Sequence, residues 1–78
     1  MDELRVRLER CFSAVFPALS LAEIVKAESS TVAGWDSVAS VTLFATVEEE
    51  FGIEVAIQDM KDLLSFEKLL AYLELKLQ

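Results

Sequence analysis

The sequence predicts an all-α fold, a small four-helix bundle with three longer helices, one short helix and a long loop between helices 1 and 2. Apolar residues recur at helical spacing in three separate stretches of the chain. The 78 residues include two glycines and one proline, so turn signals are few and helices are favoured. Hydrophobic residues make up 54% of the chain, a share that favours a packed fold over disorder. The length predicts a single domain over residues 1–78.

The first helix is predicted over residues 2–16. Asp2 and Glu3 lie near its start, where the helix dipole favours negative charge, and Pro17 ends it. Cys11 is expected to pack in the core, because no His or nearby base would activate its thiol. The apolar face of this helix consists of Leu4, Leu8, Cys11, Phe12 and Val15.

Residues 18–35 form a long connection that contains several apolar residues, so it is expected to pack against the helices. A short helical turn is predicted over residues 21–26. Trp35 is expected to anchor the connection, and contact with a partner or with a bound group is the alternative.

The second helix is predicted over residues 37–51, where no Gly or Pro interrupts the chain, and Gly52 supplies the stop. Asp36 is the expected N-cap, and the alternative is that Ser37 caps the helix itself. A phosphate esterified to Ser37 would meet unpaired amides and the positive end of the helix dipole. The core face consists of Leu43, Phe44, Val47 and Phe51, with Ser40 on the same side.

A second face of this helix carries apolar residues that point away from the core face. They stand beside polar and acidic residues, a combination that suggests a docking surface for a partner. The alternative is that a neighbouring loop covers some of them. The residues of this predicted partner-binding face are Val38, Val41, Thr42, Ala45, Glu48 and Glu49.

The carboxy-terminal third is predicted to hold two more helices. Residues 53–57 alternate like a strand, but a single strand would have no partner in this chain, so an extended link is expected. A short third helix is predicted over residues 58–63, and Ser65 is the expected N-cap of a last helix from Phe66 to about Leu77. The core stripe of that helix consists of Phe66, Leu69, Leu70, Leu73 and Leu77.

The charge distribution narrows the class of partner. The formal net charge is −7, and residues 27–60 contain no Lys or Arg. Nucleic acid is therefore disfavoured as a partner, and proteins with basic docking patches are favoured. A single cysteine excludes an intrachain disulfide and fits a reducing, cytoplasmic location. The charged amino terminus lacks a signal-peptide core, and no apolar run is long enough for a membrane span.

The segment Gly34-Trp35-Asp36-Ser37-Val38 and the acidic-aromatic block of residues 48–55 together resemble the acyl carrier protein family. The family's Asp-Ser-Leu signature stands here as Asp-Ser-Val, and the resemblance covers essentially the whole chain. It implies that Ser37 carries a covalent 4'-phosphopantetheine arm donated by coenzyme A, whose thiol holds acyl groups as thioesters. It also implies that Asp36 positions the metal and the serine while a phosphopantetheinyl transferase acts.

The expected function is therefore that of an acyl carrier, a monomer that presents acyl groups to acyl-loading and acyl-transferring enzymes and has no catalytic residue of its own. Ser37 lacks the base that a catalytic nucleophile needs, and the chain lacks the His and Cys ligands of a typical metal site. Ala39 and Thr42 stand where fatty-acid carriers usually have acidic residues, which points to a dedicated fatty acid, polyketide or other specialised acyl pathway. The alternative is a small helical protein–protein interaction module without a prosthetic group.

Overall fold

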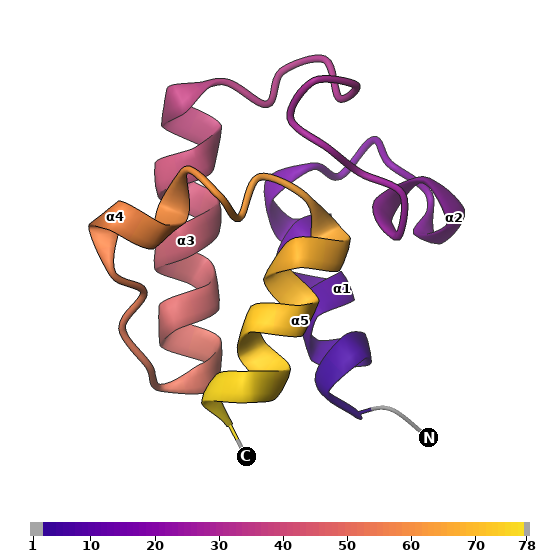
Figure 1. Ribbon diagram of the computed structural model, residues 1–78. Coiled ribbons are helices and arrows are strands. Elements are labelled where there is room, and N and C mark those ends of the chain that lie inside the picture. Colours follow the sequence, from indigo (N-terminus) through magenta and orange to yellow (C-terminus); the bar gives the residue numbers. More distant parts are fainter. Residues whose placement is uncertain (1–2, 78) are drawn as a thin grey trace.

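The computed structural model describes residues 3–77, and within them the chain forms five α-helices and no strand (Figure 1). The all-α class is confirmed. The description as four helices is incomplete, because the long loop contains a short helix of its own. Asp2, which was predicted to begin the first helix, lies outside the described residues. The helices are α1 (Glu3–Val15), α2 (Leu21–Ile24), α3 (Ser37–Phe51), α4 (Ile57–Met60) and α5 (Phe66–Lys76).

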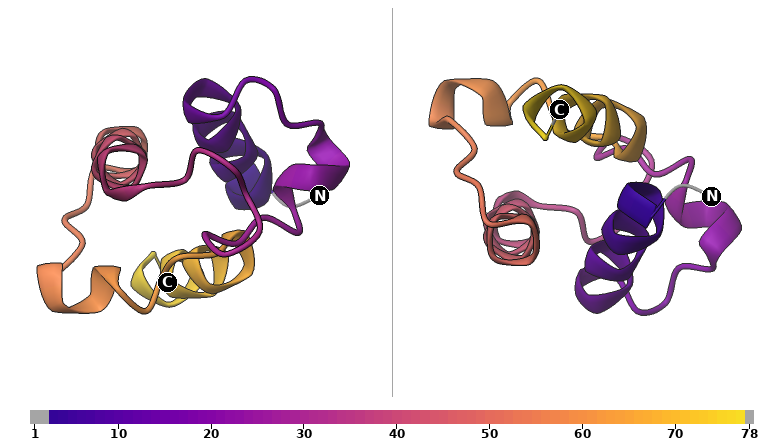
Figure 2. Two further views of the ribbon diagram at one scale, coloured as in Figure 1. Left: turned by 90° about the horizontal axis from the view of Figure 1, so that it is seen from above. Right: turned by 90° about the horizontal axis from the view of Figure 1, so that it is seen from below.

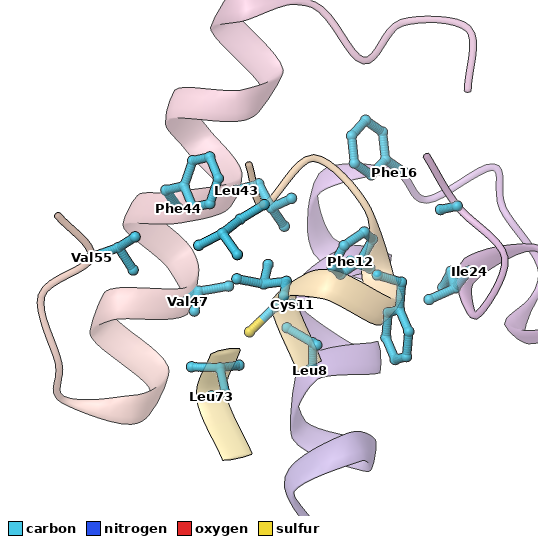
Figure 3. Close-up of a cluster of buried hydrophobic side chains, with 14 of the residues drawn as sticks. Leu8, Cys11, Phe12, Phe16, Ile24, Leu43, Phe44, Val47, Val55 and Leu73 are labelled. Atoms are coloured by element: carbon cyan, nitrogen blue, oxygen red, sulfur yellow. The ribbon is translucent and has the colours of Figure 1, made fainter. Parts of the chain in front are cut away.

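The three longer helices surround one hydrophobic core. Figure 2 shows α1, α3 and α5 arranged around the middle of the molecule, with α2 outside α1 and α4 at the edge, connected to α3 by an extended link. The predicted core face of α3 is confirmed, since its four apolar residues are all buried. Leu77 departs from the prediction, because it follows the last helical residue and is 42% exposed. Figure 3 shows the side chains that meet at the centre, among them Leu8, Cys11, Phe12, Leu43, Phe44, Val47 and Leu73.

The helix α2 forms because its first turn is capped from both sides. Ser20 Oγ accepts a hydrogen bond of 3.2 Å from the Glu23 amide, and Glu23 Oε1 accepts one of 2.8 Å from the Ser20 amide. This reciprocal pair is a capping box. The bond from the Ser20 amide, which stabilises the carboxylate, lowers the pKa of Glu23. The predicted turn over residues 21–26 is thus a helix that ends at Ile24, whose side chain is fully buried.

The remainder of the long connection is tied to the start of α5. Glu28 and Ser65 form an isolated antiparallel bridge, the Ser29 amide donates to Leu64 O at 3.0 Å and the Phe66 amide donates to Ala27 O at 3.0 Å. Ser65 also caps α5, as predicted, because its hydroxyl accepts a hydrogen bond of 3.1 Å from the Lys68 amide. These bonds hold the loop in place before it reaches α3.

The link between α3 and α4 is extended and forms no strand, as predicted. The short helix predicted over residues 58–63 is α4. It begins one residue earlier and ends three residues earlier than predicted, at Ile57–Met60. It ends at Met60 because the chain tightens there: the Asp62 amide donates to Asp59 O and the Leu63 amide to Met60 O, which are i+3 bonds. No residue of α4 is buried, and the flanking Val55 and Leu63 attach it to the core.

Candidate functional site

Asp36 closes the amino end of α3 and leaves Ser37 as the first residue of the helix. The Asp36 backbone is extended, and its carboxylate oxygen Oδ1 accepts a hydrogen bond of 2.8 Å from the Ala39 amide. The Ser40 amide donates to Asp36 O at 2.9 Å. A side chain that accepts from a first-turn amide is an N-cap. Of the two capping alternatives, Asp36 is therefore the cap, and the Ser37 hydroxyl is not needed for that role.

The Ser37 side chain is exposed, and its hydroxyl makes no hydrogen bond with any other part of residues 3–77. The amides of Ser37 and Val38 belong to the first turn, where a helix offers them no partner of its own. These amides and the positive end of the dipole of a 15-residue helix suit a phosphate attached at this point. The residues present therefore fit a phosphate ester on Ser37.

The turn that delivers the chain to Ser37 is anchored in the core by Trp35. This side chain is 6% exposed, and its ring packs against Phe12 and Phe16 with centroid distances of 5.7 and 5.3 Å. Its indole Nε1 donates a hydrogen bond of 2.9 Å to Ser40 Oγ, one turn into α3. Gly34 precedes it at φ +89°, a left-handed conformation that favours glycine. Trp35 thus anchors the connection, as predicted, and fixes the position of the helix start.

The predicted partner-binding residues of the first three turns of α3 are exposed. Val38 is 74% and Val41 is 69% exposed, and Thr42 and Ala45 are exposed as well. No loop within residues 3–77 covers them, so the alternative that a neighbouring segment buries this face is wrong. The Thr42 hydroxyl donates to Val38 O at 3.1 Å within the helix, which satisfies it internally. This part of the surface is consequently mostly apolar.

The acidic residues at the other end of α3 are mostly engaged within the protein. Glu48 Oε2 accepts a hydrogen bond of 2.8 Å from the Val55 amide, and Glu50 Oε2 lies 2.8 Å from Arg7 Nε in an ion pair. Glu49 is exposed and has no partner elsewhere in the described part of the chain. Of the two predicted docking acids, Glu48 therefore holds the link to α4, and Glu49 faces solvent.

Sequence reasoning missed Ile57, which is 83% exposed at the start of α4. Residues 53–57 alternate in hydrophobicity, and this pattern groups Ile57 with Val55, which is buried. The grouping fails because the extended backbone ends at Ala56, and the helix that starts at Ile57 rotates its side chain outward. No signal in the sequence distinguished the two residues.

The Cys11 thiol lies in the core and is held in its unreactive form. Burial, together with the negative charge of Glu50, raises the pKa of the Cys11 thiol to about 11 despite the opposing charge of Arg7. At neutral pH this thiol is protonated, and a protonated thiol is a poor nucleophile. Within residues 3–77 no three His, Cys, Asp or Glu side chains group closely enough to hold a metal ion.

The fold and the site together define a class of protein: a small helical scaffold that presents one exposed hydroxyl at a rigidly held helix start. A family model for the phosphopantetheine attachment site matches residues 8–73, and the chain therefore belongs to the phosphopantetheine attachment (PP-binding) family. Members of this family carry 4'-phosphopantetheine covalently on a serine, so the chain is a phosphopantetheine carrier. The match favours this role over that of an interaction module without a prosthetic group. Searches of the curated proteins and of the solved structures give no match.

None of the helices formed by residues 3–77 combines the length and the apolar character that crossing a membrane requires. Carriers of this family interact with a phosphopantetheinyl transferase and with acyl-handling enzymes.

Proposed function

We propose that Ser37 is the residue that carries the arm and that the chain is an acyl carrier protein. The observation that carries this proposal is the exposed, unbonded Ser37 hydroxyl at a helix start whose cap is supplied by another residue. The thiol of the bound arm holds acyl groups as thioesters, and the protein presents them to partner enzymes. The chain contributes the attachment oxygen, the first-turn amides and the surrounding surface, while the reactive thiol belongs to the arm.

Loading forms a bond between Ser37 Oγ and the phosphorus that bears the pantetheine in coenzyme A. The adenosine bisphosphate portion of coenzyme A leaves, and the serine proton passes to a base of the transferase. Asp36 Oδ1 is engaged in capping, but the side chain is exposed, and Asp36 directly precedes Ser37 in the chain. Asp36 therefore helps to position the metal and the serine while the transferase acts.

The partner-binding face consists in this proposal of Val38, Val41, Thr42, Ala45, Glu48 and Glu49. The net charge of −7 favours approach by acyl-loading and acyl-transferring enzymes with basic docking patches, because opposite fields steer encounter. The first turn of α3 contains no acidic residue, which supports a dedicated fatty acid, polyketide or other specialised acyl pathway. The carrier acts as a monomer in the cytoplasm, and the unpaired Cys11 fits such a reducing compartment.

The proposal is tested by incubating the protein with coenzyme A and a phosphopantetheinyl transferase of broad substrate range, followed by intact-mass measurement. We expect the mass of one phosphopantetheine to be added to the wild type and nothing to be added to Ser37→Ala. Because Ser37 is exposed and does not cap α3, Ser37→Ala keeps the circular dichroism spectrum of the wild type. Loading of Ser37→Ala, or folded wild type that is never loaded, would refute the assignment.

A further inference from the structure

An open groove lies between α2 and the loop that leads to the start of α3. It has a volume of about 510 Å³, a size typical of sites that bind small molecules. Its apolar wall consists of Leu19, Ala22, Ala27 and Val32. Ala27 is buried, and Leu19 and Val32 are half-buried against the core. The small side chains of the two alanines leave the groove open beside a packed interior.

Hydrogen bonds hold both walls of this groove in place. On one side, the capping box of Ser20 and Glu23 forms α2. On the other side, the Val32 amide donates to Glu28 O at 3.0 Å, and the Trp35 amide donates to Val32 O at 3.2 Å. Because the Trp35 side chain is buried and bonded to the first turns of α3, the groove has a fixed position relative to the helix start.

Lys26 supplies a positive charge to the groove. Its side chain is exposed, lines the groove and makes no ion pair or hydrogen bond with any other part of residues 3–77. Glu23 also lines the groove, but its Oε1 accepts the hydrogen bond from the Ser20 amide and is directed toward the start of α2. A negatively charged ligand group that enters the groove therefore meets a free ammonium group beside an apolar wall.

The groove lies within reach of a group tethered to Ser37. Ala33 lines the groove and precedes Ser37 by four residues, so their Cα atoms are at most about 14 Å apart. The path from phosphorus to sulfur in phosphopantetheine has roughly 13 bonds, about as many as four residues of chain, and it spans about 14 Å when extended. Figure 1 shows the segment after α2 running along one end of the molecule to the start of α3. An arm on Ser37 therefore brings its thiol to the edge of the groove and an attached acyl group into it.

We infer that this groove holds the acyl group of the loaded carrier, and that Lys26 selects a short acyl group that ends in a carboxylate. The inference rests on the proposed role of Ser37. The apolar wall contacts the thioester and the first carbons, while the Lys26 ammonium group pairs with the carboxylate, which is ionised at neutral pH. A short group is favoured because the length of the arm is used in reaching the groove. An acyl group without the carboxylate gains the apolar contact alone.

Carriers loaded with a malonyl or an acetyl group test this inference. A phosphopantetheinyl transferase moves the acylated phosphopantetheine of malonyl- or acetyl-coenzyme A to the carrier. Hydroxylamine, which is uncharged at neutral pH, then attacks the thioester carbonyl and releases the thiol of the arm, and intact-mass measurement follows the rate. We expect the malonyl thioester on the wild type to be cleaved about threefold more slowly than malonyl-pantetheine free in solution, because an exposed ion pair stabilises the bound form by roughly this factor.

Two substitutions in the groove have matched controls on α5. Lys26→Gln should speed cleavage of the malonyl thioester about threefold and leave the acetyl thioester within about 1.5-fold of the wild type. Ala22→Phe fills the groove from an exposed position and should also speed malonyl cleavage. Lys68→Gln and Ala71→Phe make the same changes at exposed positions that do not line this groove, and they should leave both rates unchanged. Thermal unfolding followed by circular dichroism establishes that each variant is folded at the assay temperature.

Amide chemical shifts locate the acyl group independently of any rate. Relative to a carrier whose arm bears no acyl group, malonyl loading should shift the amides of Ala22, Ala27 and Val32. Shifts at Leu43 and Val47 in their place would put the acyl group in the helical core and overturn the inference. Unchanged amides throughout would mean that the acyl group stays in solvent, and the inference would fail in that case too.

The outcomes separate this inference from the proposed function. Equal malonyl cleavage in the wild type, Lys26→Gln and Lys68→Gln would overturn the inference, and the role of Ser37 would stand because the arm had been loaded there. A folded wild type that accepts no acylated phosphopantetheine would instead refute the proposed function itself.

Discussion

The two halves of α3 differ in what holds them. In the carboxy-terminal half, Phe51 is buried beneath the Arg7 guanidinium, whose carbon lies 4.5 Å from the ring centroid. Arg7 also donates to Glu50 Oε2 at 2.8 Å and to Glu50 O at 2.6 Å. In the amino-terminal half, Ser37, Val38 and Val41 face solvent. One helix is thus fastened to α1 at one end and exposes the proposed attachment residue, Ser37, at the other.

The difference between the two halves of α3 shows how a small hydrophobic core can fix the position of an exposed site. A group that enzymes must reach cannot itself be covered, so its position has to be fixed by neighbouring residues. Trp35 fixes the start of α3 through its packing on Phe12 and Phe16 and its hydrogen bond to Ser40. The hydrogen bonds of Glu48 with the Val55 amide and of Glu50 with Arg7 fix the carboxy-terminal end of the helix. The exposed residues of the amino-terminal half are consequently not needed to hold the helix in place.

The largest expected effect contrasts a buried aromatic ring with an exposed valine on the same helix. Phe51→Ala should lower the free energy of unfolding by about 3–5 kcal/mol, because it leaves a cavity and removes the platform for Arg7. Val41→Ala should change it by less than about 0.5 kcal/mol, because the side chain is mostly exposed. Urea denaturation of both variants measures the difference. Similar losses for the two would contradict the proposed division of the helix.

Substitutions of Asp36 separate its role as the N-cap of α3 from its proposed role in loading. Asp36→Ala should lower the free energy of unfolding by about 1 kcal/mol, because the Ala39 amide loses its cap. Asp36→Asn keeps an oxygen that accepts from this amide and should retain most of the stability. If the carboxylate positions the metal and the serine, both variants should be loaded more slowly than the wild type. Loading of Asp36→Asn at the wild-type rate would limit Asp36 to the capping role.

Much of this arrangement could be predicted from the sequence, because it follows from local rules. Helical periodicity identified the core face of α3, and the Asp-Ser pair with Gly52 gave its start and its end. The Ser20-x-x-Glu23 pattern of a capping box also stood in the sequence, and it explains why the turn predicted over residues 21–26 is a helix of its own. These features depend on residues within one or two turns of each other.

The remaining features depend on contacts between distant segments. The ion pair of Arg7 with Glu50 joins residues 43 positions apart. The hydrogen bond from the Val55 amide to Glu48 connects the link that follows α3 to the helix itself. Neither pairing is visible in a periodic pattern, so Glu48 and Glu49 were both assigned to the docking surface from the sequence. The exposure of Ile57 likewise follows from the residue at which α4 begins. Backbone hydrogen bonds around that residue set where the helix starts, and they are not visible in the sequence pattern.

The smallest expected effect separates two neighbouring glutamates. Glu48→Gln keeps an acceptor for the Val55 amide but loses its charge, so we expect the free energy of unfolding to fall by about 0.5–1 kcal/mol. Glu49→Gln should leave it within about 0.3 kcal/mol of the wild type, because the side chain is exposed and unbonded within residues 3–77. For a domain of this size the first change corresponds to a fall of a few degrees in Tm, which differential scanning calorimetry resolves. A larger loss for Glu49→Gln than for Glu48→Gln would mean that Glu48 is free for partners, and the carboxy-terminal half of α3 would then belong to the recognition surface.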